Sequence, residues 1–396
     1  MTEEAFSNSK RSLEDINEVL LLAKLTENDL VSTSQMIYFT EDLQGNQYKL
    51  LELDKHLLNV LKQGDTLYIK GNDEENAVLC TNSKTYDLLE TETSNSLLLV
   101  DNLQFHNNLK NIPNRNISEI TIKTVFHDYL EVIPSKPHLK KLKELLKNVV
   151  YKGPENEYEI NEEDLFTHDE LLYKIQASEE EFMVALKALN AITISNKLRI
   201  LDFEYHFRVL SYMLKLIDEN SWQLDEIDYE ETMNALNELI PTNILNNLFD
   251  LYLEESKVID GLQLYRYNEE KVCKFFAQVL LHSAGKFNLN EFLQAWAESV
   301  PEGMVVTEDM LHGIAIIDRK SIPNVIWAFQ EESLPENINE RFQVLFEARE
   351  KWTVKEIAPY IQSLTTEKFD VNALLAKYAR ASTVQGTKYY SSKHTK

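Results

Sequence analysis

The sequence predicts an α+β protein in which a barrel-like, β-rich domain precedes tandem winged-helix units, three or four in number. Two observations predict this order. Short apolar runs separated by turn residues fill the first third of the chain, and amphipathic helices followed by hairpins recur through the rest. A length of 396 residues also favours several domains over one. In chain order, the predicted domains span residues 1–130, 136–205, 206–268, 269–335 and 336–396.

The first domain is predicted to be a sheet of short strands. Strands this short favour a barrel whose edge stays open, and an open edge is a liability unless another chain pairs with it. A partner chain that completes the barrel is one hypothesis, and a self-closed barrel is the other. The predicted strands cover residues 36–40, 47–53, 66–70, 77–81, 85–89 and 97–100, with a helix over 54–62 and a helix or strand over 12–25. The candidate partner contacts are Val78, Leu79, Cys80, Tyr86, Leu88 and Leu98.

Capping boxes mark helix starts in the rest of the chain. In this pattern a side chain at each end satisfies a backbone N–H group of the first helical turn. The matching pairs are Thr167 with Glu170, Ser178 with Glu181, Thr353 with Glu356, and the Asp variant Asp228 with Glu231. The first unit then has helices over 137–150, 168–177 and 179–190, and a hairpin with strands at 192–195 and 198–203. Three helices followed by a hairpin is the winged-helix order.

The same order recurs at intervals of roughly 63 to 69 residues, with units starting near residues 137, 206, 269 and 338. The second unit has helices over 206–219, 229–239 and 243–255, and a wing near 261–267. The third has helices over 269–283, 289–299 and 308–314, and a wing over 315–329. The fourth has helices over 338–351, 354–364 and 371–380, and a wing over 384–392. This regularity predicts a repetitive helical architecture.

Basic residues gather at the end of a chain whose formal net charge is -25. Residues 371–396 hold five Lys or Arg and no Asp or Glu. Lys377 and Arg380 share one face of the predicted third helix of the fourth unit, which favours phosphate contacts without base reading. A solvated basic tail, including Lys396, is the alternative. The candidate DNA contacts are Lys377, Arg380, Lys388, Lys393, Arg349, Lys351 and Lys355.

A second basic island covers residues 136–152, on the outer face of an amphipathic helix. A solvated face is the commoner meaning of such a pattern. Acidic residues begin the third helix of the first unit, and the second unit is acidic throughout its second and third helices. These two units are therefore predicted to bind protein.

No catalytic, metal or cofactor motif is present in the sequence. Nine glycines form neither GxGxxG nor GxxxxGK[ST], and HExxH and GxSxG are absent. Two distant cysteines, Cys80 and Cys273, fit a reducing compartment, and no signal or membrane span is apparent. We therefore expect a soluble intracellular protein that is not an enzyme and has no metal, cofactor or membrane partner.

Two functions remain open on the residues alone. One is a replication or chromatin assembly subunit whose last winged helix touches DNA. The other is a protein-only winged-helix scaffold, as in a ubiquitin-ligase or proteasome-lid-type complex. The basic C-terminal face favours the first.

Five stretches of the sequence resemble one known family. They are AVLCTNSKTYDLLETETSNSLLLV (77–100), QASEEEFMVALKALNA (176–191), KFNLNEFLQAWAESVPEGM (286–304), ERFQVLFEAREKWTVKEIAPYIQSL (340–364) and LLAKYARAS (374–382). They resemble the sister chromatid cohesion subunit of the alternative clamp loader, from the family called "defective in sister chromatid cohesion". The resemblance runs in order through nearly the whole chain after about the first 15 residues.

The resemblance implies a non-catalytic, nuclear subunit of a replication factor C-like complex. It implies that the β-rich domain joins a small subunit and the tail of the large subunit in a composite barrel. It further implies that the winged helices bind the catalytic subunit of DNA polymerase epsilon, near residues 136–203, and single- and double-stranded DNA. The complex would load or unload PCNA and support cohesion. The DNA-binding face of the family matches this sequence best at Lys377, Arg380 and Lys393. The family is described with three winged helices, whereas four repeats are counted in this sequence.

Overall fold

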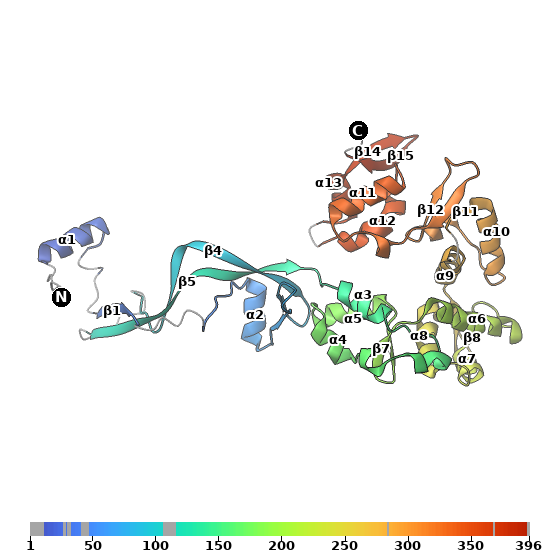
Figure 1. Ribbon diagram of the computed structural model, residues 1–396, viewed down its shortest axis with the longest axis horizontal. Helices are drawn as coiled ribbons and strands as arrows, with labels where there is room; N and C mark the ends of the chain where they lie inside the picture. The colour runs from blue at the N-terminus through green and yellow to red at the C-terminus, as the bar shows by residue number, and fades with distance from the viewer. Residues whose placement is uncertain are drawn as a thin grey trace. The chain divides into compact units, whose positions relative to one another are not determined.

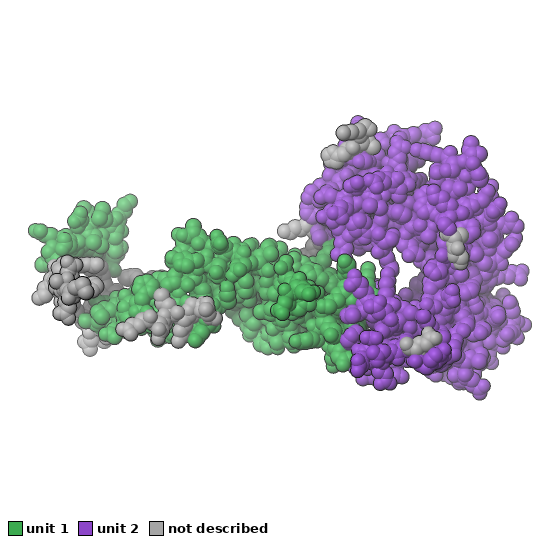
Figure 2. Space-filling view, in the orientation of Figure 1, with its two compact units in different colours: residues 1–143, 168–187 green, residues 144–167, 188–396 purple. Residues whose placement is uncertain are grey.

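The computed structural model describes residues 12–26, 29, 33–40, 47–105, 116–282, 285–366 and 369–393. It is an α+β structure with several small sheets, which confirms the predicted class (Figure 1). The chain divides into two compact units (Figure 2). Unit 1 comprises residues 1–143 and 168–187, and unit 2 comprises residues 144–167 and 188–396.

Unit 1 is built on a five-stranded sheet with the order β1-β5-β4-β3-β2. The strands are β1 (Thr33–Phe39), β2 (Tyr68–Lys70), β3 (Val78–Cys80), β4 (Thr85–Val100) and β5 (Asn116–Ser135). Strand β1 runs parallel to β5, and the other neighbours are antiparallel. Because β1 and β2 stand at opposite edges, the described residues form an open sheet and no closed barrel, so the self-closed alternative is not found.

The longest strand of the sheet was not predicted. Strand β5 pairs with β4 from Ile122 to Ser135, and the predicted strands at 85–89 and 97–100 are two ends of β4. The predicted strand at 47–53 contributes only an isolated bridge from Leu51 to Leu130. Helix α2 (Lys55–Gln63) lies where it was predicted and buries Leu57 against Leu79 and Tyr86. Helix α1 (Leu13–Leu22) begins at a Ser12–Asp15 capping box and buries no side chain.

The first helical repeat has shorter elements than predicted. Its helices are α3 (Lys140–Lys147), α4 (His168–Lys174) and α5 (Glu179–Ala188), with 3-10 helices η3 (Pro154–Glu159) and η4 (Glu162–Asp164) between α3 and α4. The hairpin strands are β6 (Ile192–Ile194) and β7 (Lys197–Arg199). The predicted second strand is too long, because Asp202 caps the next helix through N–H groups of its first turn. At α5 the capping box is confirmed, since Glu181 and Ser178 exchange hydrogen bonds of 3.3 and 3.2 Å.

The second and third repeats each place a hairpin after their helices. The second has α6 (Phe203–Glu219), β8 (Ile227–Asp228), α7 (Tyr229–Leu236), α8 (Thr242–Tyr252), β9 (Leu253–Ile259) and β10 (Leu262–Tyr267). The third has α9 (Glu269–His282), β11 (Phe287–Asn288), α10 (Leu289–Ser299), η5 (Glu308–Leu311), β12 (Ala315–Asp318) and β13 (Val325–Ala328). In both, a two-residue strand after the first helix joins the hairpin, giving the orders β8-β10-β9 and β11-β13-β12. These two short strands were not predicted.

The fourth repeat follows the same plan. Its elements are η6 (Glu331–Ser333), α11 (Ile338–Ala348), α12 (Val354–Ile361), η7 (Gln362–Leu364), α13 (Val371–Tyr378), β14 (Ala379–Val384) and β15 (Thr387–Ser392). Trp352 forms an antiparallel bridge with Tyr390, at the place that a short strand takes in the second and third repeats. The capping box of Thr353 and Glu356 at α12 is confirmed.

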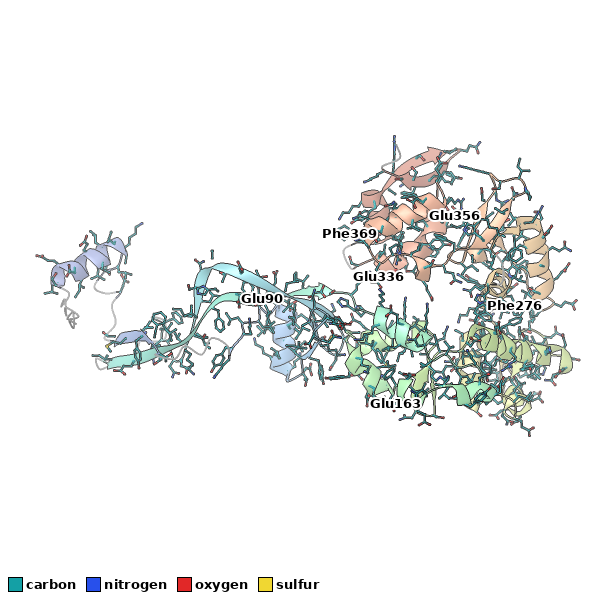
Figure 3. All side chains as sticks on the ribbon, in the orientation of Figure 1. Glu90, Glu163, Phe276, Glu336, Glu356 and Phe369 are labelled. Carbon is teal, nitrogen blue, oxygen red and sulfur yellow. The ribbon has the colours of Figure 1, made fainter. Side chains whose placement is uncertain are left out.

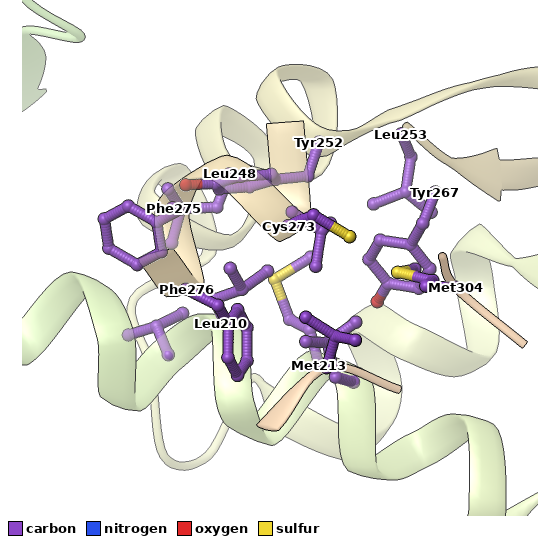
Figure 4. Close-up of a cluster of buried hydrophobic side chains, with 14 of the residues drawn as sticks. Leu210, Met213, Leu248, Tyr252, Leu253, Tyr267, Cys273, Phe275, Phe276 and Met304 are labelled. Atoms are coloured by element: carbon purple, nitrogen blue, oxygen red, sulfur yellow. The ribbon is translucent and has the colours of Figure 1, made fainter. Parts of the chain in front are cut away.

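The second and third repeats share one core instead of burying separate ones. A single cluster of buried apolar side chains extends from Tyr151 to Ile326, across the predicted boundary at residue 268. Figure 4 shows its centre, where Leu210 of α6, Leu248 of α8 and Phe276 of α9 meet. A second cluster joins Ile316 of β12 to the fourth repeat. The domain boundaries therefore remain predictions, while the packing is continuous across them.

Candidate nucleic-acid and partner interfaces

The C-terminal hairpin corrects the predicted basic face. Helix α13 ends at Tyr378, and Ala379 already has the extended backbone of a strand (φ -124°, ψ 159°). Arg380 therefore lies on β14 and does not share a helical face with Lys377. Pairing of residues 379–384 with 387–392 outweighs the helix propensity of Ala and Arg at this point. Gln385 and Gly386 make the turn with positive φ values of 50° and 80°, as hairpin turns of this kind require.

The register of the hairpin separates its two cations onto opposite faces. Arg380 pairs with Ser391, whereas Lys388 pairs with Thr383. Ala379 and Tyr390 are buried, so the face that they share with Lys388 is the inner one. The Lys388 ammonium lies 5.2 Å from the centre of the Tyr390 ring. Arg380 consequently belongs to the outer face of the hairpin.

A third segment extends this outer face. The Trp352 N–H donates to the Tyr390 carbonyl (3.0 Å), and the Tyr390 N–H donates back (2.8 Å). In an antiparallel pairing of this kind, Lys351 falls beside Ser391. One row across the sheet thus runs Arg380, Ser391, Lys351, and we call it the outer-face row. The sequence alone placed Arg380 and Lys351 on different elements.

Besides Lys388, which lies over the Tyr390 ring, three of the predicted DNA contacts are engaged within the chain. The Lys393 ammonium donates to the carbonyls of Ala376 (3.1 Å) and Lys377 (2.6 Å), and so caps α13. The Lys377 ammonium lies over the rings of Phe369 and Tyr378, at 5.3 and 5.2 Å. Both lysines line a groove of about 620 Å³ beside α11.

Arg349 is the third engaged cation. Its guanidinium lies 2.7 Å from the Glu356 carboxylate and over the Trp352 ring. Burial raises the pKa of Glu356, but hydrogen bonds from Thr353 and Arg349 outweigh it and lower the pKa. Figure 3 labels Glu356 and Phe369 in this repeat. The exposed side chains of Lys351, Lys355 and Arg380 make no hydrogen bond or ion pair within the described part of the chain. Lys396 lies outside the described residues.

Some of the predicted partner contacts are buried within unit 1, and others are partly or largely exposed. Val78, Leu79, Cys80 and Tyr86 lie in the core of unit 1, and burial raises the pKa of the Cys80 thiol. Their atoms have almost no free surface, so they support the sheet from inside. Leu88 packs against the same core, whereas Leu98 is 48% exposed. We carry the partner-contact prediction forward on Leu98 and on exposed apolar side chains that it missed: Met36, Ile37, Tyr38, Phe39, Tyr68, Ile69, Leu89, Leu97 and Ile117.

Long stretches of the sheet have open edges. Strand β3 covers only residues 85–87 of β4. From Leu89 to Val100, β4 has β5 on one side and no other strand among the residues that the structure describes. The open backbone edge and the exposed apolar side chains occur together. A strand added by another chain would pair with the edge and cover these side chains.

Helices α4 and α5 of the first helical repeat present acidic and apolar side chains on their surface. Tyr173 of α4 and Met183 and Val184 of α5 are exposed. Asp169 and Glu170 lie in the first turn of α4, and three glutamates lie in that of α5. This composition fits a protein partner better than it fits a polyanion.

In the described ranges, no group of three or more His, Cys, Asp or Glu side chains gathers to hold a metal ion. No helix within those ranges has both the length and the apolar character to cross a bilayer.

Comparison with known proteins places the chain in a family. The family model of the sister chromatid cohesion protein Dcc1 matches residues 48–361. The chain belongs to the Dcc1 family. It is 39% identical over 385 residues to sister chromatid cohesion protein DCC1 of Xenopus laevis, covering 97% of this chain and 98% of that protein. To the human protein of the same name the identity is 38%, over 97% and 99% of the two chains. The Saccharomyces cerevisiae protein is 23% identical, over 84% and 93%.

Membership of the Dcc1 family confirms the resemblance seen in the sequence. The relatives are named as sister chromatid cohesion proteins. The match to the family model ends before α13 and the C-terminal hairpin, so of the outer-face row it covers Lys351 and neither Ser391 nor Arg380.

Proposed function

We propose that this protein is a non-catalytic, nuclear subunit of the alternative replication factor C clamp loader that supports sister chromatid cohesion. The observation that carries the proposal is near-full-length similarity to cohesion proteins in a chain whose first sheet is open. The clamp loader loads or unloads PCNA, and catalysis of ATP hydrolysis belongs to other subunits.

In this proposal the open sheet is completed by other chains. The small subunit and the tail of the large subunit pair with the edges of β1, β2 and β4 and close a composite barrel. Exposed side chains such as Phe39, Ile69 and Leu98 are buried on assembly. Burial of apolar area contributes about 25 cal/mol per Å² before the costs of association.

The helical repeats are winged helices that bind the catalytic subunit of DNA polymerase epsilon and DNA. We place the polymerase contact on the exposed face of α4 and α5, around Tyr173, Met183 and Val184. We place the DNA contact on the outer-face row, where Arg380 and Lys351 are free to meet phosphate. The contacts would give affinity for single- and double-stranded DNA without sequence choice.

The assembly is tested by purifying the tagged chain from its own cells at moderate salt and identifying what remains bound by mass spectrometry. Recovery of clamp-loader subunits and polymerase epsilon supports the proposal. Recovery of ubiquitin-ligase or proteasome-lid subunits in their place would replace it with the protein-only scaffold.

The DNA contact is tested with variants of the purified complex. Arg380→Glu with Lys351→Glu should weaken duplex binding and reduce the slope of log K against log salt by about two, since each phosphate contact contributes about 0.9. Lys388→Glu is compared with the single variant Arg380→Glu as a matched control, because each reverses one charge, on the inner and the outer face of the same hairpin. Equal loss in both variants would show that net charge, and not the outer-face row, carries the binding.

A further inference from the structure

The turn between α4 and α5 is held by side chains that precede it by about 100 residues. The Lys70 ammonium donates to three carbonyls at the end of α4: those of Leu172 (2.8 Å), Ile175 (3.3 Å) and Ala177 (2.7 Å). A cation at the C-terminus of a helix satisfies carbonyls that have no partner within the helix and complements the helix dipole. Lys70, which lies on β2 of the same unit, therefore caps the C-terminal end of α4.

Further hydrogen bonds fix the same turn to the sheet. The Gln176 side-chain amide donates to the Asn76 carbonyl (2.6 Å). The Thr85 hydroxyl donates to the Glu181 carboxylate (2.6 Å) and accepts from the Ser178 N–H (2.9 Å). Gln176, Ser178 and Thr85 are all buried. Buried polar groups that are mutually satisfied give a rigid and specific arrangement.

Lys70 links this turn to an edge of the sheet. It belongs to β2, whose three residues pair only with β3 among the residues described. Its neighbours Tyr68 and Ile69 are 51% and 65% exposed. Helix α5, which begins directly after the turn, exposes Met183 and Val184. One side chain thus connects an open edge to the helix that carries an exposed apolar face.

Burial lowers the pKa of Lys70, because the ammonium is partly removed from water. The three carbonyls compensate for that loss of hydration only while β2 and the end of α4 keep their positions. Displacement of β2 would take the Lys70 donor away from these carbonyls, and the turn before α5 would keep only its bonds to Asn76 and Thr85.

We propose that Lys70 is a positioning residue that couples the β2 edge to the α4–α5 face. A strand that pairs with β2 fixes Lys70 and thereby orders α5, which raises the affinity of the α4–α5 face for its protein partner. This inference rests on the proposed function, since it needs both the strand partner and the partner of α5. By linkage, the second partner must strengthen the first to the same degree.

The coupling is tested by hydrogen exchange on the full-length chain, alone and assembled with the two clamp-loader segments expected to complete the sheet. The variants are Lys70→Met, which keeps the chain length and removes the donors, and Lys62→Met, an exposed lysine at the end of α2. In the wild type and Lys62→Met, assembly should slow exchange of amides 172–184 by roughly fivefold or more, the lower range of coupling between sites. In Lys70→Met, assembly should protect β2 and leave these amides unchanged.

The inference would be overturned if assembly protected residues 172–184 of Lys70→Met as much as those of the wild type. It would also be overturned if assembly protected β2 and β4 of the wild type but not its residues 172–184. Absence of protection at the sheet edges as well would instead count against the composite barrel. Thr85→Val serves as a second variant if Lys70→Met does not fold, because it breaks two bonds of the same turn. It should also reduce the protection.

Discussion

The open sheet of unit 1 and the helical repeats of unit 2 treat their apolar residues in opposite ways. The sheet exposes much of its aliphatic and aromatic surface along β1, β2 and the far end of β4. The repeats bury theirs in a core that is continuous from Tyr151 to Ile326. Where only two strands pair, their apolar side chains are covered only if another layer of structure packs on them. Neighbouring repeats, in contrast, bury each other's apolar side chains. The proposed completion of the sheet by other chains would account for this difference.

The largest expected difference in stability is between variants of two leucines on adjacent strands, one buried and one exposed. Leu79 is 1% exposed and packs against Leu57 and Tyr86, whereas Leu98 is 48% exposed. Leu79→Ala should lower the free energy of unfolding of unit 1 by about 2–5 kcal/mol, because it opens a cavity in a small core. Leu98→Ala should change it by less than about 0.5 kcal/mol. Denaturant unfolding of both variants measures the difference.

Assembly with the clamp-loader subunits should reverse the order of the two variants. Leu98→Ala should weaken assembly, since its side chain becomes buried only in the complex. Leu79→Ala should assemble normally under conditions in which it is folded. A Leu98→Ala variant that binds its partners like the wild type would remove this surface from the proposed interface.

A partly buried histidine tests how completely the repeats exclude water. The His206 ring stacks on Phe275 (centroids 4.4 Å apart) and shares a hydrogen bond of 3.0 Å with the Tyr252 hydroxyl. Burial lowers the pKa of His206 to about 4. Between pH 6.5 and 4 the unfolded chain therefore binds a proton that the folded chain does not. Lowering the pH from 7 to 5 should cost unit 2 about 2 kcal/mol of stability through this residue.

Thermal unfolding of wild type and His206→Phe at pH 7 and pH 5 measures this cost. The variant should lose about 1 kcal/mol at pH 7, because the Tyr252 hydroxyl loses its partner, and should show less decline at pH 5. His127→Gln, which changes an exposed histidine on β5, should keep the wild-type decline. An unchanged decline in His206→Phe would assign the acid sensitivity to other groups.

Local signals in the sequence predicted where helices begin and end better than they predicted which side chains share a surface. Leu289–Ser299 was predicted with its observed ends, because Asn288 caps the helix and its apolar residues keep the helical period. The capping boxes at Ser178 and Thr353 were also predicted correctly. These features depend on residues within four positions of one another, so the sequence is sufficient to locate them.

Features that depend on distant residues escaped prediction. The end of α13 depends on the pairing of β14 with β15, and the outer-face row depends on the bridge between Trp352 and Tyr390. The three carbonyls around Lys70 come from residues about 100 positions away. The alternation of Ile120, Ile122, Thr124 and Phe126 was a usable sign of β5, since these residues share a buried face.

The smallest predicted effect separates two threonines that both precede helical segments of unit 2. The Thr353 hydroxyl accepts from the Glu356 N–H and donates to the Glu356 carboxylate, whereas Thr307 makes no side-chain cap at η5. Thr353→Ala should therefore lower stability by about 1 kcal/mol, and Thr307→Ala by only a few tenths. Glu356 also holds Arg349 beside the outer-face row, so Thr353→Ala should loosen that ion pair. Denaturant unfolding of the two variants compares the costs, and equal costs would show that the capping box adds nothing to the C-terminal repeat.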